Sequence, residues 1–366
     1  MLMLLTDGFG GAGGIAKFNR DFLQALDDCA LVHRVHALPR LIPEPIEETI
    51  PETVVYDRKA ARGRVAFMRR LAVYAFRRHR LELLICGHLY LLPAAWILAR
   101  IQRARLALII HGLEAWAPSR RRWTNRLAGT IDAFVAVSQF SAERFTAWSK
   151  VPMDQGFILP NCVDLDRFRP QDRDPMLLER YGLQSSKVIV TMGRLASVER
   201  YKGFDQVIEL MPKLLRRFPN LKYLIIGDGD DRSRLESKVK ALGVSENLIF
   251  TGRISETEKV AHYNLADVFL MPSSGEGFGI VLIEAAACGV PVVGSRIDGS
   301  REALLNGLLG RLVDPGNSNE LLETITAVLD HESCRQRIDA IEAFSTQKFR
   351  ARVADWCYGQ LARAAA

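Results

Sequence analysis

Two glutamates eight residues apart follow a glycine-rich turn in the second half of this sequence. Glu276 lies in the turn 273–277 (Ser-Ser-Gly-Glu-Gly), and Glu284 lies about two turns into a predicted helix, 280–288. The apolar run 266–272 before the turn predicts a buried strand. This order can bring backbone N–H groups close to a phosphate at the helix N-terminus, while the carboxylates accept hydrogen bonds from sugar hydroxyls. The alternative is an ordinary strand-loop-helix crossing with two solvated glutamates.

Two cations precede this element in the chain. Arg194 directly follows a predicted strand, 188–192, and Lys202 follows eight residues later. Both would lie at the carboxyl end of a parallel sheet, where a diphosphate leaving group must be neutralised. Arginine offers a planar fork for phosphate oxygens and lysine a compact point charge.

Three further segments have chemically suggestive side chains. His111 ends the predicted strand 106–110, a place that suits a structural histidine as well as a catalytic one. The sequence Asp-Gly-Asp-Asp at 228–231 resembles an Asp-x-Asp metal motif, but its place after a strand predicts a loop and helix N-cap. The glycine-rich loop 8–14 is a weak dinucleotide signal, because no acidic residue ends the second strand, 31–38.

The elements that position these residues alternate between short apolar runs and amphipathic segments. Strands are predicted at 2–5, 31–38, 83–86, 106–110 and 133–137, and then at 188–192, 221–226, 248–251, 268–271 and 291–294. Helices are predicted at 14–26, 280–288 and 349–364. This pattern predicts an α/β protein with two doubly wound parallel sheets, whose ligands bind beyond the carboxyl ends of the strands.

Taken together, these motifs resemble the retaining GT-B glycosyltransferases of glycosyltransferase family 4. Glu276 and Glu284 match the family's Glu-x7-Glu motif, and Arg194 and Lys202 match its Gly-Arg-Leu…Lys-Gly element. Residues 160–164, Pro-Asn-Cys-Val-Asp, resemble its interdomain signature, with Cys162 in place of the usual glycine. The resemblance implies two Rossmann-like domains facing a cleft: an acceptor-binding domain at 1–163, a donor-binding domain at 164–346, and a helix at 347–366 that crosses back to the first domain.

The resemblance also implies roles for individual residues. His111, Arg194, Lys202 and Glu276 would be catalytic, and Ser138, in a Ser-x-x-Ser loop, would face the acceptor. Glu276 would contact the donor sugar and Glu284 the ribose. The donor-binding residues would be Gly13, Gly14, Arg194, Lys202, Arg253, Ile254, Glu276, Phe278, Gly279, Ile280 and Glu284. No metal or other cofactor is expected.

Composition sets limits on the class of protein. No run of 18 uncharged apolar residues is present, and the start of the sequence does not resemble a signal peptide. The six scattered cysteines suit buried thiols in a reducing cytosol better than a disulfide framework or a zinc site. Between Arg58 and Arg126 the sequence has 16 Lys/Arg and two Asp/Glu, whereas residues 166–366 are neutral.

Part of this positive charge falls on one predicted helix. Arg62, Arg69, Arg77 and Arg80 share a narrow arc of its helical wheel, with Arg70 at the edge. Val65, Met68, Leu71, Ala72, Ala75 and Phe76 are expected on the other side, which makes a basic amphipathic helix. An anionic membrane surface is the favoured partner, because family members often act on lipid-linked acceptors. Solubility alone is the alternative, and nothing resembles a nucleic-acid-binding motif.

The sequence therefore predicts a cytoplasmic, metal-independent, retaining glycosyltransferase, peripheral on the cytoplasmic face of the membrane. It would move a hexose from a nucleotide diphosphate sugar to a glycan or lipid-linked acceptor, as in polysaccharide biosynthesis, with an α-linkage. UDP-glucose or a related UDP-hexose is the favoured donor and GDP-mannose the alternative. A GT-B phosphorylase or sugar-nucleotide epimerase, and an inactive basic scaffold bound to membranes, are the rival functions.

Overall fold

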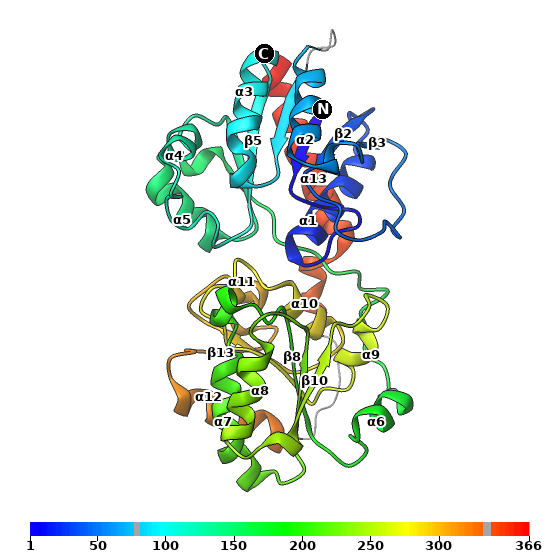
Figure 1. Ribbon diagram of the computed structural model, residues 1–366, viewed down its shortest axis with the longest axis vertical. Helices are drawn as coiled ribbons and strands as arrows, with labels where there is room; N and C mark the ends of the chain where they lie inside the picture. Colours follow the sequence, from blue (N-terminus) through cyan, green and yellow to red (C-terminus); the bar gives the residue numbers. More distant parts are fainter. Residues whose placement is uncertain (77–80, 332–337, 366) are drawn as a thin grey trace. The chain divides into compact units, whose positions relative to one another are not determined.

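The structure is a computed structural model that describes residues 1–76, 81–331 and 338–365. The chain divides into two compact units. Unit 1 contains Met1–Cys162 and Thr346–Ala366, and unit 2 contains Val163–Ser345. The divisions fall one residue before the expected boundaries at 163 and 346. Each unit is built on one parallel sheet (Figure 1).

The sheet of unit 1 has seven strands in the order β3-β2-β1-β4-β5-β6-β7. All of its neighbouring strands pair in parallel. The expected strands at 2–5 and 83–86 form with those bounds, while β2 starts four residues later than predicted. The bounds are β1 (Leu2–Leu5), β2 (Val35–Pro39), β3 (Val54–Tyr56), β4 (Leu83–Cys86), β5 (Arg105–Ile110), β6 (Ala133–Ala136) and β7 (Gly156–Ile158).

Helices cover both faces of this sheet because its strands are apolar on both sides. One core joins alternate strand residues such as Leu2 and Leu4 to Phe67, Leu71 and Tyr74 of α2. The helices of unit 1 are α1 (Gly14–Asp27), α2 (Arg64–Ala75), α3 (Leu92–Gln102), α4 (Arg122–Ala128), α5 (Gln139–Ser149) and α13 (Thr346–Ala365).

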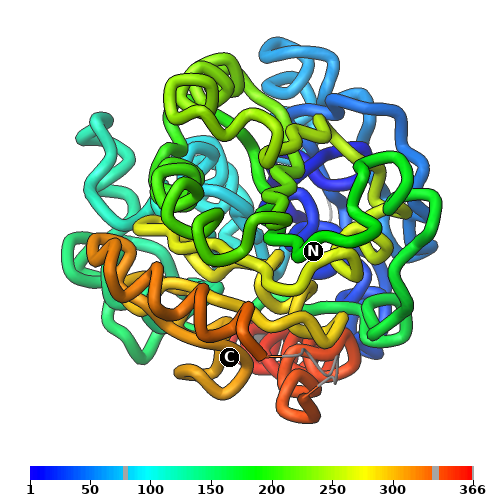
Figure 2. The backbone as a smooth tube through the Cα atoms, turned by 90° about the horizontal axis from the view of Figure 1, so that it is seen from below, coloured from blue at the N-terminus to red at the C-terminus, as the bar shows by residue number. Residues whose placement is uncertain are grey.

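The last helix, α13, belongs to unit 1 and lies against α1, as the red and blue segments in Figures 1 and 2 show. Aromatic rings make this contact. Phe18 of α1 meets Phe349 edge to face with ring centroids 5.8 Å apart, and Phe22 meets Trp356 at 5.7 Å. The two ends of the sequence therefore share one core.

The basic helix α2 differs from its predicted arrangement. The core takes Phe67, Leu71 and Tyr74, whereas Val65, Met68 and Phe76 are 66%, 59% and 83% exposed. The helical wheel was wrong about these three side chains, because periodicity reveals apolar arcs without showing which arc meets the core. Arg69 is exposed on α2. Arg62, which was predicted to share this helix, is exposed on the 3₁₀ turn Ala60–Arg62, because Gly63 with φ 130° separates that turn from α2. Arg77 and Arg80 lie outside the described residues.

Unit 2 has a six-stranded parallel sheet in the order β10-β9-β8-β11-β12-β13. Its core joins Ile189, Tyr223 and Val268 on the strands to apolar side chains of α7, α8 and α12. The strands are β8 (Val188–Met192), β9 (Lys222–Ile226), β10 (Leu248–Gly252), β11 (Val268–Met271), β12 (Val292–Ser295) and β13 (Arg311–Val313). The helices are α6 (Pro175–Tyr181), α7 (Phe204–Arg217), α8 (Arg232–Ala241), α9 (Lys259–Tyr263), α10 (Ile280–Ala287), α11 (Ser300–Ala303) and α12 (Ser318–Asp330).

Candidate active site

The glycine-rich turn between β11 and α10 is held by a buried aspartate that the sequence analysis did not single out. Asp298 is 2% exposed and lies in the loop after β12. Its Oδ2 accepts hydrogen bonds from the Ser273 hydroxyl and from the Glu276 backbone N–H, the latter at 2.9 Å, while Oδ1 accepts from Ser300 N at 2.9 Å. Burial raises the pKa of Asp298 even though these hydrogen bonds oppose the rise. Asp298 thus fixes the backbone at Glu276.

The turn ends at Gly279, which is the N-cap of α10 and has φ 94°. A side chain there would strain the backbone, so this position needs glycine. Phe278 is 2% exposed and Ile280 is the first residue of α10. The first N–H groups of an α-helix have no intrahelical acceptor. The positions predicted to approach a diphosphate therefore occupy a helix N-terminus.

The predicted phosphate-binding cations lie on a short 3₁₀ segment, η4 (Ser197–Lys202), and on the turn before it. Lys202 Nζ is 2.7 Å from Glu276 Oε1 and 3.6 Å from Glu199 Oε2. Arg194 pairs with Glu199 Oε1. Glu199 therefore links the two cations, and Lys202 joins them to Glu276.

Electrostatics favour the charged forms in this set. Burial disfavours a charged Lys202, yet the carboxylate of Glu276, the Tyr201 phenol and the carboxylate of Glu199 together raise the pKa of Lys202 well above its ordinary value. The Arg194 side chain is 68% exposed, whereas those of Lys202 and Glu276 are 15% exposed. Arg194 can therefore change its partner at little cost, while Lys202 and Glu276 are held in place.

The loop after β9 holds η4 in place through hydrogen bonds and ion pairs. Asp230 accepts from the Ser197 backbone N–H at 2.9 Å and from its hydroxyl at 2.6 Å. Asp231 is the N-cap residue of α8, but its side chain makes no capping bond and instead pairs with Arg200 and Arg234. Among the described residues no group of three His, Cys, Asp or Glu side chains could hold a metal ion. The aspartates of this loop position the segment that carries Lys202.

Glu284 has a different environment from Glu276. Its side chain is fully buried in α10, and its Oε2 accepts a hydrogen bond from the Tyr263 hydroxyl at 2.8 Å. Lys259 Nζ lies 3.6 Å from the same oxygen. Glu284 Oε1 is buried without a hydrogen-bond partner among the residues that the structure describes. Buried polar atoms are ordinarily hydrogen-bonded, so this oxygen calls for an explanation.

The remaining predicted donor residues of unit 2 lie at the same edge of the sheet. Arg253 and Ile254 follow β10, the former exposed and the latter half-buried. The loops after β8, β9 and β10 are connected through their backbones, since Gly193 N donates to Ile226 O and Gly227 N donates to Gly252 O. The structure thus brings together the predicted residues of this unit.

Of the unit 1 residues, His111 directly follows β5 and is half-buried. Its Nε2 lies 2.9 Å from Gly87 O, which can only accept, so Nε2 carries the proton and Nδ1 is the acceptor. His88, which the sequence analysis passed over, stacks on His111 with ring centroids 6.4 Å apart. Burial lowers the pKa of both imidazoles although the carboxylate of Glu114 opposes this. Both rings are therefore neutral at physiological pH.

Gly13 and Gly14 begin α1. Gly13 is its N-cap with φ 91°, and no atom lies within 4 Å of the place where a Cβ would be. Arg20 reaches back from α1 to the carbonyl oxygens of Gly8 and Gly11, at 3.0 and 2.7 Å. This keeps an open glycine turn in a fixed shape at the start of the helix.

Ser138 has a structural explanation. It is fully buried, and its side chain caps α5 by accepting from the Ser141 backbone N–H at 3.1 Å. Its expected contact with an acceptor stays a prediction.

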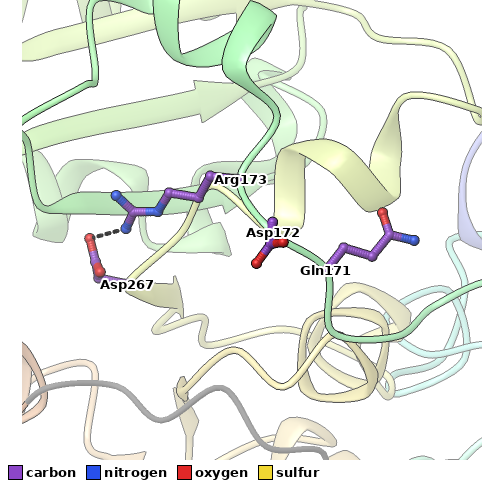
Figure 3. Close-up of a pocket in the computed structure, with 4 residues that line it drawn as sticks. All are labelled: Gln171, Asp172, Arg173 and Asp267. Atoms are coloured by element: carbon purple, nitrogen blue, oxygen red, sulfur yellow. Dashed lines mark ion pairs between the residues drawn. The ribbon is translucent and has the colours of Figure 1, made fainter.

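A shallow pocket of unit 2 lies at the opposite end of β8 and β11, and Figure 3 shows its lining of Gln171, Asp172, Arg173 and Asp267. Arg173 pairs with Asp267 at 2.7 Å, and Asp267 also accepts from Val188 N. These contacts tie the segment before α6 to the sheet and are remote from the glycine turn.

Family models match both units. Residues 12–167 match the model described as Glycosyltransferase Family 4, and residues 179–343 match Glycosyl transferases group 1.

The chain is also similar to mannosyltransferases of Mycolicibacterium and Mycobacterium. It is 36% identical over 287 residues to a GDP-mannose-dependent alpha-(1-6)-phosphatidylinositol monomannoside mannosyltransferase of Mycolicibacterium smegmatis, covering 75% of this chain and 71% of that protein. It is 33% identical over 238 residues to a phosphatidyl-myo-inositol mannosyltransferase of Mycobacterium leprae, covering 64% of this chain and 58% of that protein.

Solved structures show the same architecture. Anabaena Alr3699/HepE in complex with UDP-glucose superposes with a TM-score of 0.76 at 19% identity, covering 98% of this chain and all of that one. Sucrose-phosphate synthase from Thermosynechococcus elongatus gives 0.73 at 20% identity, covering 99% and 98%. At these identities the likeness establishes the fold, which is GT-B as predicted.

Proposed function

The chain belongs to glycosyltransferase family 4, and from that premise we propose that it is a retaining, metal-independent enzyme that transfers a hexose from a nucleotide diphosphate sugar. The observation that carries the proposal is the linked set of Arg194, Glu199, Lys202 and Glu276 beside the N-terminus of α10. Two cations and free helix N–H groups suit a diphosphate, and a fixed carboxylate suits sugar hydroxyls.

In this proposal charge builds on the departing diphosphate as the glycosidic bond breaks. Arg194 and Lys202 stabilise that charge, together with the backbone amides at Gly279 and Ile280. The departing phosphate takes the proton of the acceptor hydroxyl, which attacks the face that the phosphate leaves and so forms an α-linkage. The neutral imidazole of His111 adds no positive charge to the site, and its Nδ1 can accept a hydrogen bond from a sugar hydroxyl.

The donor that we now favour is GDP-mannose, the alternative in the sequence analysis, rather than UDP-glucose. Its support is the GDP-mannose-dependent mannosyltransferase activity of the relatives from Mycolicibacterium smegmatis, Mycobacterium tuberculosis and Corynebacterium glutamicum. For the same reason an inositol phospholipid is the acceptor class that we favour. Base recognition would involve the segment Arg253–Ile254 after β10.

A panel of donors tests this proposal. A ligand that binds only the folded protein raises its unfolding temperature by an amount that grows with concentration relative to its dissociation constant. We expect GDP-mannose to give the largest shift among GDP-mannose, UDP-glucose, UDP-galactose and ADP-glucose, and to be slowly hydrolysed without acceptor. A larger shift with a UDP-hexose would restore the first choice of donor. No shift and no hydrolysis with any of the four would favour the inactive scaffold.

We further propose that α2 docks unit 1 on the cytoplasmic face of an anionic membrane. Val65, Met68 and Phe76 are exposed at spacings that place them on one face, and exposed Arg69 lies one turn from Val65. Apolar side chains flanked by arginine are typical of helices that lie in the membrane interface. Within residues 1–76, 81–331 and 338–365 no helix has the length and apolar character needed to cross a bilayer.

Vesicle flotation tests the docking proposal. The protein should float with vesicles that contain anionic phospholipid and not with neutral vesicles, and salt should weaken the binding as the Debye length falls from about 10 Å at 0.1 M to about 3 Å at 1 M. Equal recovery with both kinds of vesicle, or with neither, would return the arginines to a role in solubility.

A further inference from the structure

The environment of Glu284 is asymmetric between its two carboxylate oxygens. Oε2 accepts from the Tyr263 hydroxyl at 2.8 Å and faces Lys259 Nζ at 3.6 Å. Oε1 is buried and has no hydrogen-bond partner in the described part of the chain. Leaving a buried acceptor unsatisfied is destabilising, and more so for a charged group, so this arrangement needs a reason.

Tyr263 is itself held rigidly. It is fully buried, its ring lies 5.6 Å from that of Phe269 and 6.2 Å from that of Phe168, and its hydroxyl is 3.4 Å from Met192 Sδ. Burial, together with the charge of Glu284, raises the pKa of the Tyr263 phenol well above its ordinary value, so the phenol keeps its proton. Its hydroxyl is therefore a fixed donor at one place.

Lys259 completes the arrangement from the first residue of α9. Its side chain is 17% exposed and lies between Glu284 and Glu256, with Nζ 2.9 Å from Glu256 Oε1. Paired charge at this distance compensates part of the cost of burying the Glu284 carboxylate. Tyr263 therefore orients the Glu284 carboxylate, and Lys259 compensates its negative charge.

We propose that Tyr263 is a positioning residue for the nucleotide, because its hydroxyl fixes the Glu284 carboxylate so that Oε1 is presented to the ribose diol of a nucleoside diphosphate. The inference rests on the proposed function and on the family resemblance, which implies that Glu284 contacts the ribose. Without the Tyr263 hydroxyl the carboxylate keeps its place in α10 but loses the bond that orients it. The specific loss is then recognition of the ribose hydroxyls, not of the diphosphate.

The experiment compares GDP with 2′,3′-dideoxy-GDP by isothermal titration calorimetry on the full chain. Wild type should bind GDP at least tenfold more tightly, since hydrogen bonds to a charged group are lost in the dideoxy ligand. Tyr263→Phe should weaken GDP binding and leave dideoxy-GDP binding nearly unchanged, so that the ratio falls to about threefold or less. In a Glu284→Ala background, Tyr263→Phe should have no further effect on the ratio.

The chain offers a matched control in Tyr223. This tyrosine of β9 is also fully buried, and its hydroxyl donates to Thr191 Oγ1 at 2.9 Å. Tyr223→Phe removes the same atom from the same unit without a contact to Glu284, so its GDP to dideoxy-GDP ratio should equal that of wild type.

The outcomes separate this inference from the function on which it rests. Wild-type discrimination that persists in Tyr263→Phe, or is lost equally in Tyr223→Phe, overturns the role of Tyr263 alone. A wild-type protein that binds GDP without regard to the ribose hydroxyls overturns the role of Glu284 as well, and one that binds no nucleoside diphosphate overturns the proposed function. If Tyr263→Phe fails to fold, Lys259→Gln replaces it, with a smaller fall of the same ratio expected and an unchanged ratio counting against the arrangement.

Discussion

The cations of the two units have opposite surroundings. In unit 2 the predicted phosphate-binding cations form ion pairs with carboxylates. Arg194 pairs with Glu199, and Lys202 pairs with both Glu276 and Glu199. In unit 1, Arg69 of α2 and Arg62 of the turn before it are exposed and make no ion pair with the described residues, whereas Arg70 of α2 pairs with Asp57. The two functions place different demands on geometry. A site that stabilises a transition state needs cations fixed to within a fraction of an ångström. A surface that binds a membrane needs only enough total positive charge.

This contrast also predicts how salt acts on each unit. Exposed charges are screened by added ions, and buried or partly buried pairs much less so. Membrane binding by α2 should therefore fail at salt concentrations that leave donor hydrolysis nearly unaffected.

The largest effect is expected from the two cations of the donor site. Lys202→Ala, and separately Arg194→Ala, should lower kcat by about a hundredfold or more, because each removes charge stabilisation from the departing diphosphate. Steady-state kinetics with the preferred donor measures this. Arg217→Ala is a suitable control, since Arg217 pairs with Asp330 at the far end of α7 from Lys202. Near-normal rates in Lys202→Ala or Arg194→Ala would remove that residue from the site.

The two glutamates should separate catalysis from binding. Glu276→Gln keeps the shape of the side chain but weakens hydrogen bonds to the sugar, so it should lower turnover by roughly tenfold or more and leave GDP affinity almost unchanged. Glu284→Ala should weaken GDP binding itself. Kinetics measures the turnover of both variants, and calorimetry measures their GDP affinity. If Glu276→Gln weakened GDP binding and Glu284→Ala lowered only turnover, the sugar and ribose roles of the two glutamates would be exchanged.

On the membrane side, Arg62→Glu with Arg69→Glu should reduce recovery with anionic vesicles by about tenfold or more, because each basic residue near such a surface contributes about 1 kcal/mol. Met68→Ser with Phe76→Ser should weaken binding to a smaller extent by removing apolar contact. Lys213→Glu with Arg216→Glu, on exposed positions of α7 in unit 2, makes the same charge change elsewhere and should have little effect. Donor hydrolysis should be the same in all of these variants, and equal flotation of the α2 and α7 variants would contradict the docking proposal.

The smallest effect is expected from metal removal. Since Arg194 and Lys202 supply positive charge at the diphosphate, EDTA should leave the rate unchanged and added magnesium or manganese should not raise it. Loss of activity in EDTA with recovery on adding either ion would replace the metal-free mechanism.

Much of the sheet was predictable because buried strands of a parallel sheet are continuous apolar runs. The strands at 2–5, 83–86, 188–192 and 268–271 formed with the predicted bounds. The sequence analysis missed β3, β7 and β13, which are edge strands of three residues each, too short for a recognisable period.

The site was predictable only where residue types and spacing match a known motif. Asp298 and Tyr263 lie 22 and 21 residues from the glutamates that they contact, and nothing in their local sequence announces those contacts. The ion pairs of Glu199 could have been predicted, because an acidic residue in the short segment between Arg194 and Lys202 is close to both cations in the sequence. The face that α2 turns to solvent could not be predicted, since two apolar arcs compete for one core.

The return of α13 to unit 1 has a consequence for the synthesis of the protein. Unit 2 is one continuous stretch and can complete its core as soon as Ser345 has been made. Unit 1 starts first but needs Thr346 onward, so Phe18 and Phe22 lack their partners Phe349 and Trp356 until all of unit 2 has been translated. Domains ordinarily fold in the order in which they emerge from the ribosome. Here the second unit can finish before the first, and the aromatic face of α1 stays exposed to chaperones meanwhile.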